Sequence, residues 1–353
     1  MVEFGTVHPY DDDTVREIVD AACAEWTVDA IEPIERGTDA VFSLSVSMPE
    51  GSREVVLKAA EFVDAERFVA EPGIIDAVDR ATDVPVPTVI GTVTDDPDPT
   101  TTDAPDLPTP YFVMDRCPGV NGNDLETGED GQVQRARESG RYLAALHELD
   151  AGVEAFGHVE STDGGFTVRD GTGTWSAYLA SEVPGQFEDR LRSGRFGDLW
   201  PEISTALEQV FEALPPVEAC LLHNDWRPGN LLVDPDSGAI TAVLDWGSAI
   251  AGHVEWELAM VEQGFVEWRA HDTAHRERVR EALYRSYESR RTLDRDTGFE
   301  WRRAAYLLVS RVVAMQWFPY WNQDASAEKR DEMAAIHRDA FHARRARLEA
   351  LET

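Results

Sequence analysis

Four polar residues in the middle of the chain have the types and spacing of a phosphoryl-transfer site. His223, Asp225 and Asn230 follow the pattern H-x-D-x-x-x-x-N, and Asp245 then opens a D-x-G triplet. Moving a γ-phosphoryl group is mainly positioning and charge neutralisation. The protein must supply a carboxylate that orients the incoming hydroxyl, and oxygen ligands that hold Mg²⁺ on the phosphates. We expect Asp225 to be the base, assisted by His223 as a brace of the loop. Asn230 and Asp245 supply the hard oxygen donors for the metal.

A single lysine is the candidate for a phosphate contact. Lys58 closes the strand-like run 55–58, the kind of strand that lays a lysine along the α- and β-phosphates. Strand-end lysines are usually solvated charges, but only Lys58 and Lys329 are lysines in this chain. Keeping one here indicates that a compact ammonium is needed where a guanidinium would not fit. Glu71 in the following helix is its expected partner, with Glu66 as the alternative.

Hydrophobic patterns predict the elements that position these residues. Short apolar runs at 220–222, 231–233 and 240–244 indicate buried strands on both sides of the motif. The other expected elements are a helix over 11–26, strands over 30–35, 40–46 and 53–59, a helix over 64–80, strands over 88–93 and 111–116, a helix over 132–149, a loop over 164–174, a helix from 175 and only helix after 256.

Two details of this pattern bear on function. The dipeptide Pro72-Gly73 predicts a kink or a late start of the second helix. Gly37, in the turn 36–39 between the first two strands, lies where a loop covering a nucleotide would be. Hairpin turns contain glycine routinely, so contact with phosphate at this turn and an ordinary turn both stay open. The pattern predicts a β-rich lobe over 1–117 and an α-rich lobe over 118–353.

Composition excludes several classes of partner. The 353 residues are 42% hydrophobic, enough for a sizeable core, and carry a formal charge of −35. Such an acidic surface repels nucleic acid and anionic lipid, so we expect neither as a partner. Acidity with almost no lysine resembles the cytosolic proteins of extreme halophiles, and we hypothesise stable folding only in molar salt. Three scattered cysteines and the absence of a leader or long apolar run indicate a soluble, cytoplasmic protein.

These motifs, with Lys58 and the segment 252–259 (GHVEWELA), resemble the aminoglycoside phosphotransferase / choline kinase-like family over roughly residues 25–320. The resemblance implies an α+β, protein-kinase-like bilobal fold with a small antiparallel β-rich N-lobe and a larger α-helical C-lobe. It also implies transfer of the γ-phosphoryl of ATP or GTP, with Mg²⁺, to a hydroxyl of a small molecule. By the same resemblance, the backbone of Asp115 and Cys117 meets the purine, with Met114 behind it.

Three positions depart from the usual family pattern. An acidic residue is common where Gly247 stands, and Asp is common at the positions of His253 and Glu257. Glu257 is a conservative replacement, whereas His253 removes a carboxylate expected to be structural. The identity of the phosphate acceptor therefore stays open. The sequence also leaves the oligomeric state open. A catalytically idle nucleotide-binding module is the alternative function. A protein kinase is disfavoured because no A-P-E-like segment follows Asp245.

Overall fold

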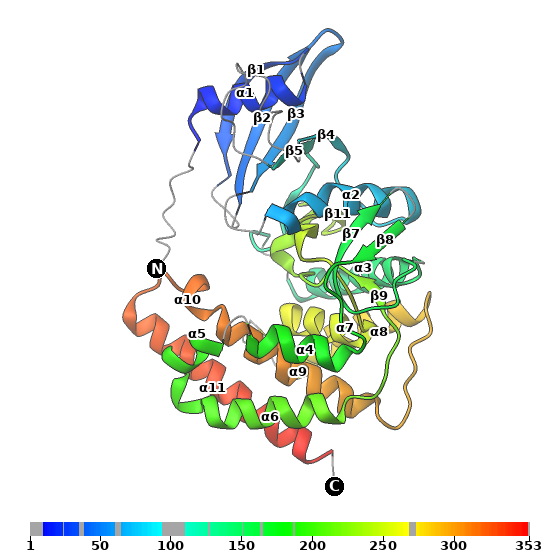
Figure 1. Ribbon diagram of the computed structural model, residues 1–353, viewed down its shortest axis with the longest axis vertical. Coiled ribbons are helices and arrows are strands. Elements are labelled where there is room, and N and C mark those ends of the chain that lie inside the picture. Colours follow the sequence, from blue (N-terminus) through cyan, green and yellow to red (C-terminus); the bar gives the residue numbers. More distant parts are fainter. Residues whose placement is uncertain are drawn as a thin grey trace. The chain divides into compact units, whose positions relative to one another are not determined.

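The computed structural model describes residues 10–23, 25–34, 39–60, 65–93, 110–125, 128–149, 151–162, 165–185, 188–267 and 273–351. The chain forms two compact units (Figure 1). The first comprises Met1–Glu126, Glu160–Phe166 and Gly229–Ser248, and the second comprises Thr127–Val159, Thr167–Pro228 and Ala249–Thr353. The first unit therefore takes in Asn230 and Asp245, although they lie far along the chain.

The first unit is built on an antiparallel five-stranded sheet. Its order is β1-β2-β3-β5-β4, with β1 at Thr27–Pro33, β2 at Ala40–Met48, β3 at Gly51–Ala59, β4 at Val89–Val93 and β5 at Tyr111–Asp115. Helix α1 (Asp12–Ala22) is capped by the preceding Asp11, whose carboxylate accepts from the Thr14 N–H. Its apolar stripe of Val15, Ile18 and Val19 joins the core formed with this sheet. The strands expected in this region are confirmed within a few residues.

Helix α2 (Ala65–Ala81) follows β3 and carries Glu71. The helix begins at Ala65 and continues through Pro72, so of the two alternatives, a kink or a late start, the late start is wrong. Pro72 lacks an N–H to donate within the helix, but one missing bond does not end a helix that packs along its length. The adjacent Gly73 lets another segment come close, because a Cβ there would lie 2.7 Å from the Cβ of Ser161.

A second sheet of this unit carries the metal-ligand candidates. Strands β10 (Leu231–Val233) and β11 (Ile240–Val243) form a hairpin, and β6 (Val120–Asn121) pairs with β10. The one-turn helix η2 (Pro228–Asn230) precedes β10, and η3 (Trp246–Ser248) follows β11. These strands and β9 (Cys220–Leu222) confirm the expectation that short buried strands bracket the motif.

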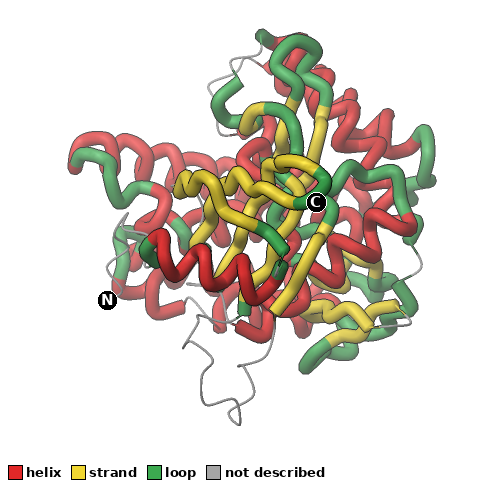
Figure 2. The backbone as a smooth tube through the Cα atoms, turned by 90° about the horizontal axis from the view of Figure 1, so that it is seen from above, coloured by secondary structure: helices red, strands yellow, loops and turns green. Residues whose placement is uncertain are grey.

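The second unit is mainly helical, and Figure 2 draws the helices of both units in red. Its helices are α3 (Glu129–His147), α4 (Trp175–Gly185), α5 (Glu188–Ser193), η1 (Gly197–Leu199), α6 (Trp200–Ala213), α7 (Val254–Glu262), η4 (Gln263–Glu267), α8 (Thr273–Glu288), α9 (Phe299–Gln316), α10 (Phe318–Trp321) and α11 (Ala327–Glu349). A short sheet of order β8-β7-β12-β9 accompanies them, with β7 at Gly157–Thr162, β8 at Gly165–Val168 and β12 at Ile250–Gly252. Among the helices within the described ranges, none combines the length and the apolar character needed to cross a membrane.

Two expectations for this unit are wrong. The loop expected over 164–174 contains β8, a strand of only 4 residues that pairs with the preceding strand β7 and leaves little local signal. The stretch after 256 is not all helix, because residues 291–296 separate α8 from α9 without forming one. Gly140 brings α3 and α8 into close contact, since a Cβ there would lie 2.2 Å from the Leu283 carbonyl oxygen. The mixed α+β class, with a β-rich unit and an α-rich unit, is confirmed.

Candidate active site

Lys58 is the centre of a buried charge cluster in the first unit. Its Nζ lies 2.7 Å from Glu71 Oε2, 2.9 Å from Asp245 Oδ1 and 3.3 Å from Asp39 Oδ2. Burial works against the lysine charge, but the carboxylates outweigh it, Asp245 most strongly, and raise the pKa of Lys58 well above its usual value. Lys58 is therefore a fixed ammonium. Sequence reasoning anticipated Glu71 as the partner of Lys58, but not the direct contacts of Asp245 and Asp39 with the lysine.

Strand register explains why these groups meet. Val41 on β2 lies opposite Lys58, so Asp39, just before β2, reaches the same end of β3. Glu71 is fixed from its other oxygen, because Oε1 accepts from the Trp246 N–H at 3.1 Å. Burial raises the pKa of Glu71 to about 7, since one lysine cannot neutralise three carboxylates. The side chain of Glu66, the alternative partner, lies outside what the structure describes.

Asn230 and Asp245 lie at one end of the β10–β11 hairpin. Leu231 pairs with Val243, and the Asn230 carbonyl accepts from the Leu244 N–H at 2.8 Å. Asp245 has φ of +65°, a left-handed conformation that costs free energy for a residue with a Cβ and therefore indicates a constrained position. Local strand pairing thus brings the two metal-ligand candidates together within one unit.

The donor set at this hairpin end fits Mg²⁺. One carboxylate and one amide are both hard oxygen donors. No group of three or more His, Cys, Asp or Glu side chains suited to a metal occurs within the described part of the chain. A protein-only cage is not needed, because Mg²⁺ usually keeps several waters and binds through one or two carboxylates plus substrate phosphates.

Asp225 belongs to the second unit, where two neighbours in sequence hold it. Arg227 donates from Nε to both carboxylate oxygens of Asp225, at 2.9 and 3.1 Å. The Asp225 N–H donates to Nδ1 of the fully buried His223 at 3.2 Å, and the His223 ring meets that of Trp226 edge-on. The loop therefore fixes both the backbone and the carboxylate of Asp225. Arg227 was not predicted, although a basic residue two positions from the base was a readable signal.

A buried chain of hydrogen bonds anchors the same loop. The Asn224 N–H donates to Glu257 Oε1 at 2.6 Å, and Glu257 Oε2 lies 2.7 Å from His147 Nε2. His147 Nδ1 in turn lies 3.0 Å from the Tyr287 hydroxyl. Asn224 has φ of +62°, and its side-chain oxygen accepts from Trp256 Nε1 at 2.9 Å. Helices α3, α7 and α8 thus set the position of the loop, through contacts that local patterns do not show.

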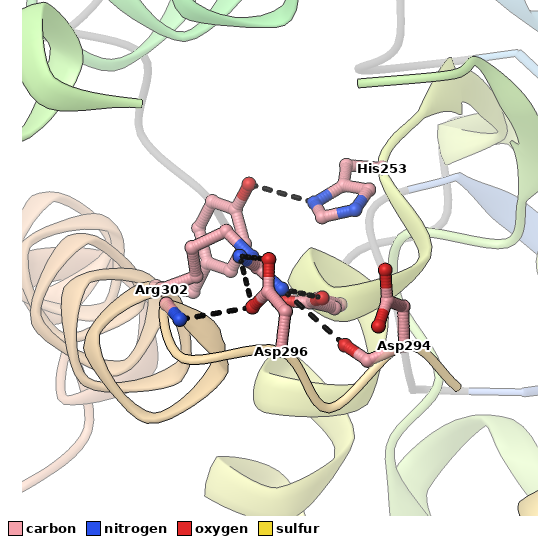
Figure 3. Close-up of polar contacts among 7 residues, drawn as sticks. His253, Asp294, Asp296 and Arg302 are labelled. Atoms are coloured by element: carbon pink, nitrogen blue, oxygen red, sulfur yellow. Dashed lines mark hydrogen bonds and ion pairs between the residues drawn. The ribbon is translucent and has the colours of Figure 1, made fainter. Parts of the chain in front are cut away.

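His253, which departs from the usual family residue, is held by a tyrosine rather than by a charge. Its Nδ1 lies 2.8 Å from the Tyr306 hydroxyl (Figure 3). Burial, with smaller contributions from Arg302 and His147, lowers the pKa of His253 to about 3. The ring is therefore neutral at pH 7, and its Nδ1 forms a hydrogen bond with the tyrosine hydroxyl.

Carboxylates are present beside His253, but they bind arginine. Arg302 donates from Nε and Nη2 to the two oxygens of Glu255, at 2.8 and 2.7 Å, and from Nη1 to Asp296 at 2.8 Å (Figure 3). Burial of Glu255 raises the pKa of its carboxyl, whereas the bonds from Arg302 act in the opposite direction. This buried network ties α7 to α9 next to His253.

Gly247 has a steric reason to lack a side chain. A Cβ at this position would lie 3.2 Å from Glu71 Oε2. An acidic side chain at residue 247 would have to leave from this crowded point, next to a carboxylate that already holds Lys58 and the Trp246 N–H. The departure from the family pattern at Gly247 thus accompanies the close approach of Glu71 to η3.

The residues expected near the purine lie at the end of β5. Met114 and Asp115 pair with Val56 and Val55 of β3, and the Asp115 N–H donates to the Thr88 carbonyl at 2.9 Å. Cys117 follows two residues later, and burial raises the pKa of its thiol to about 11. Gly37 lies outside the described residues.

The predicted residues fall into two groups. Lys58, Glu71, Asn230 and Asp245 come together in the first unit, with Met114, Asp115 and Cys117 on its central sheet. His223 and Asp225 belong to the second unit. That unit also has a cavity of about 710 Å³ between α8, α9 and α11, lined by charged residues such as Arg280, Glu281 and Arg303. None of the predicted site residues lines this cavity.

Comparison with known proteins agrees with this geometry. Residues 30–307 match the model of the phosphotransferase enzyme family, APH, so the chain belongs to that family. The fold is shared with a microcompartment-associated aminopropanol kinase (19% identity, 96% of this chain and 98% of the other, TM-score 0.66). It is also shared with an amicoumacin kinase in complex with AMP-PNP and Ca²⁺ (12% identity, 95% and 94% covered, TM-score 0.58). The expected protein-kinase-like fold is confirmed.

A longer protein contains a related segment. Acyl-CoA dehydrogenase family member 11 of Gallus gallus is 26% identical over 162 residues, which are 45% of this chain. The chain spans only 19% of the length of that relative.

Proposed function

We propose that this protein is a small-molecule O-phosphotransferase that moves the γ-phosphoryl group of ATP or GTP to a substrate hydroxyl. The observation that carries the proposal is Lys58, whose Nζ is held 2.7 Å from Glu71 and 2.9 Å from Asp245. Together with family membership, this arrangement supports a working nucleotide site. A catalytically idle module would have no need to retain the base as well as both metal ligands.

In this proposal the first unit binds the nucleotide. Lys58 contacts the α- and β-phosphates, and Glu71 keeps the ammonium in place. The backbone of Asp115 and Cys117 meets the purine edge, with Met114 behind it. The kinase fold shared with a protein that binds AMP-PNP supports a nucleotide as the donor.

Asn230 and Asp245 would hold Mg²⁺, which neutralises phosphate charge when bound. The amide and the carboxylate are fixed at the same end of the β10–β11 hairpin, so both can serve one ion. The strained backbone of Asp245 supports a constrained, functional position for its carboxylate.

Asp225 orients the acceptor hydroxyl and takes its proton. The hydroxyl oxygen forms a bond to the γ-phosphorus, the bond from that phosphorus to the β,γ-bridging oxygen breaks, and the nucleoside diphosphate leaves. The hydroxyl proton passes to a carboxylate oxygen of Asp225. Phosphoryl transfer requires positioning more than a strong base, which suits a carboxylate held at both oxygens by Arg227.

The acceptor is a small molecule with a hydroxyl group in this proposal, and the site of action is the cytoplasm. Structural relatives named as kinases of aminopropanol and amicoumacin support a small acceptor. Cys23, Cys117 and Cys220 are free and half-buried, which supports a reducing compartment. Neither nucleic acid nor membrane is proposed as a partner, because the net charge of −35 repels both.

The test is transfer of labelled γ-phosphate from ATP and from GTP to a panel of small alcohols, amino alcohols and aminoglycosides, in molar KCl with Mg²⁺. Binding of both nucleotides is measured in parallel by calorimetry. Transfer that requires Asp225 supports the proposal. The idle module would be favoured by a different result, in which the protein binds nucleotide but shows no transfer that depends on Asp225. In that case Asp225→Asn would not lower the rate of phosphate transfer to any acceptor or to water.

A further inference from the structure

We propose that Asp39 is a positioning residue that holds Lys58 and lowers the affinity of the site for nucleotide. The inference rests on the proposed function, because it assigns Lys58 to the phosphates. Asp39 Oδ2 lies 3.3 Å from Lys58 Nζ, and the Asp39 side chain is only 4% exposed. Its other oxygen, Oδ1, is buried and has no hydrogen-bond partner among the described residues. A buried carboxylate in this state is costly, which points to a role beyond packing.

The three carboxylates around Lys58 differ in how freely they can leave it. An ammonium has three N–H groups, and three carboxylates face this one. Glu71 is 2% exposed and is fixed by its second bond, from the Trp246 N–H. Asp245 is 43% exposed and is the metal-ligand candidate. Asp245 is therefore the carboxylate that would be available to hold Mg²⁺, while Glu71 and Asp39 would stay with the lysine.

The remaining charges oppose the nucleotide. With Asp245 assigned to the metal, one ammonium faces the carboxyl groups of Glu71 and Asp39, so the group offers no net positive charge to an arriving polyphosphate. Glu71 alone would balance Lys58. The extra carboxylate of Asp39 holds the ammonium in position but cancels its attraction for phosphate. At an effective dielectric constant near 20, one charge at about 6 Å changes binding by roughly a hundredfold, and molar salt screens this effect toward about tenfold.

Removing the Asp39 charge while keeping its shape tests the idea. Asp39→Asn retains an oxygen that can accept from Lys58, and Asp39→Ser is a second neutral variant should the first fold poorly. Asp29→Asn is the matched control, because Asp29 lies in the same unit, on β1, and accepts a hydrogen bond from Ser47 at 2.5 Å. It removes the same formal charge away from Lys58 and so reports any general effect of net charge.

Binding of non-hydrolysable Mg²⁺-ATP and Mg²⁺-GTP analogues is measured by calorimetry in molar KCl, with melting temperatures as a check of folding. We expect the nucleotide Kd to fall about tenfold in both Asp39 variants and to stay within about twofold of the wild-type value in the Asp29→Asn control. The KM for the acceptor should stay constant in all variants. A nucleotide Kd that is unchanged or higher in the folded Asp39 variants overturns the assignment of Asp39. A wild-type protein that binds neither analogue overturns the proposed function instead.

Discussion

Protonation of His253 provides a test of the structure through stability. The folded-state pKa is about 3, against 6.5 for an unperturbed histidine. A base whose pKa is depressed on folding stabilises the protein fully above the unfolded pKa, and this contribution is lost as the pH falls toward the folded pKa. Between pH 7 and pH 5, the loss comes to about 2 kcal/mol. Because His253 is only partly buried by surface area, this figure is an upper limit.

The informative variant is His253→Gln, whose side-chain oxygen can still accept from the Tyr306 hydroxyl. Unfolding by urea in molar KCl at pH 7, 6 and 5 gives the free energy of unfolding of both proteins. The titration of the 67 acidic residues and of His337 is common to both and cancels in the difference. We expect wild type to lose up to about 2 kcal/mol more than the variant between pH 7 and pH 5. Parallel curves would mean that His253 is not held neutral by its surroundings.

Further outcomes are expected for three variants and for a change of salt concentration. Asp225→Asn should abolish phosphoryl transfer and leave nucleotide affinity intact, whereas Asp245→Asn should weaken Mg²⁺-dependent nucleotide binding; the reverse pattern in calorimetry and turnover assays would contradict the roles. Glu257→Asp withdraws the carboxylate by about 1.5 Å from the Asn224 N–H or from His147, so kcat should fall at least about tenfold, with nucleotide Kd unchanged. The melting temperature should rise between about 0.1 M and 2 M KCl, because salt screens the charge of −35; equal values would refute the salt hypothesis.

Sequence patterns predicted the parts of the site that depend on local order. The H-x-D-x-x-x-x-N run lies between short strands, and Lys58 ends a strand followed by a helix with Glu71, so spacing and periodicity are enough to find them. The bonds of His147 to Glu257 and Tyr287 join positions 110 and 140 residues apart. No local pattern encodes such contacts, because they depend on how α3, α7 and α8 pack.

Asp39 is an intermediate case. The sequence predicts the turn that contains it, and the glycine of this turn is the candidate for nucleotide contact. The role of the aspartate depends on the register of β2 against β3, which sets Val41 opposite Lys58. A shift of one residue would turn the side chains of the strand to the other face of the sheet. The contact of Asp39 with Lys58 is therefore a property of the sheet rather than of the turn.

The use of arginine elsewhere explains why Lys58 is retained. Arg302 binds Glu255 through two of its nitrogens and Asp296 through the third, so its planar fork spreads the carboxylates apart. At Lys58, the oxygens of three different carboxylates lie within 3.3 Å of one nitrogen. A guanidinium cannot offer three bonds from a single atom, because its N–H groups are spread over three nitrogens. It is also larger than an ammonium and would need the space between Asp39 and Glu71. An acidic protein that has replaced nearly all its lysines thus keeps one where the geometry requires a point charge.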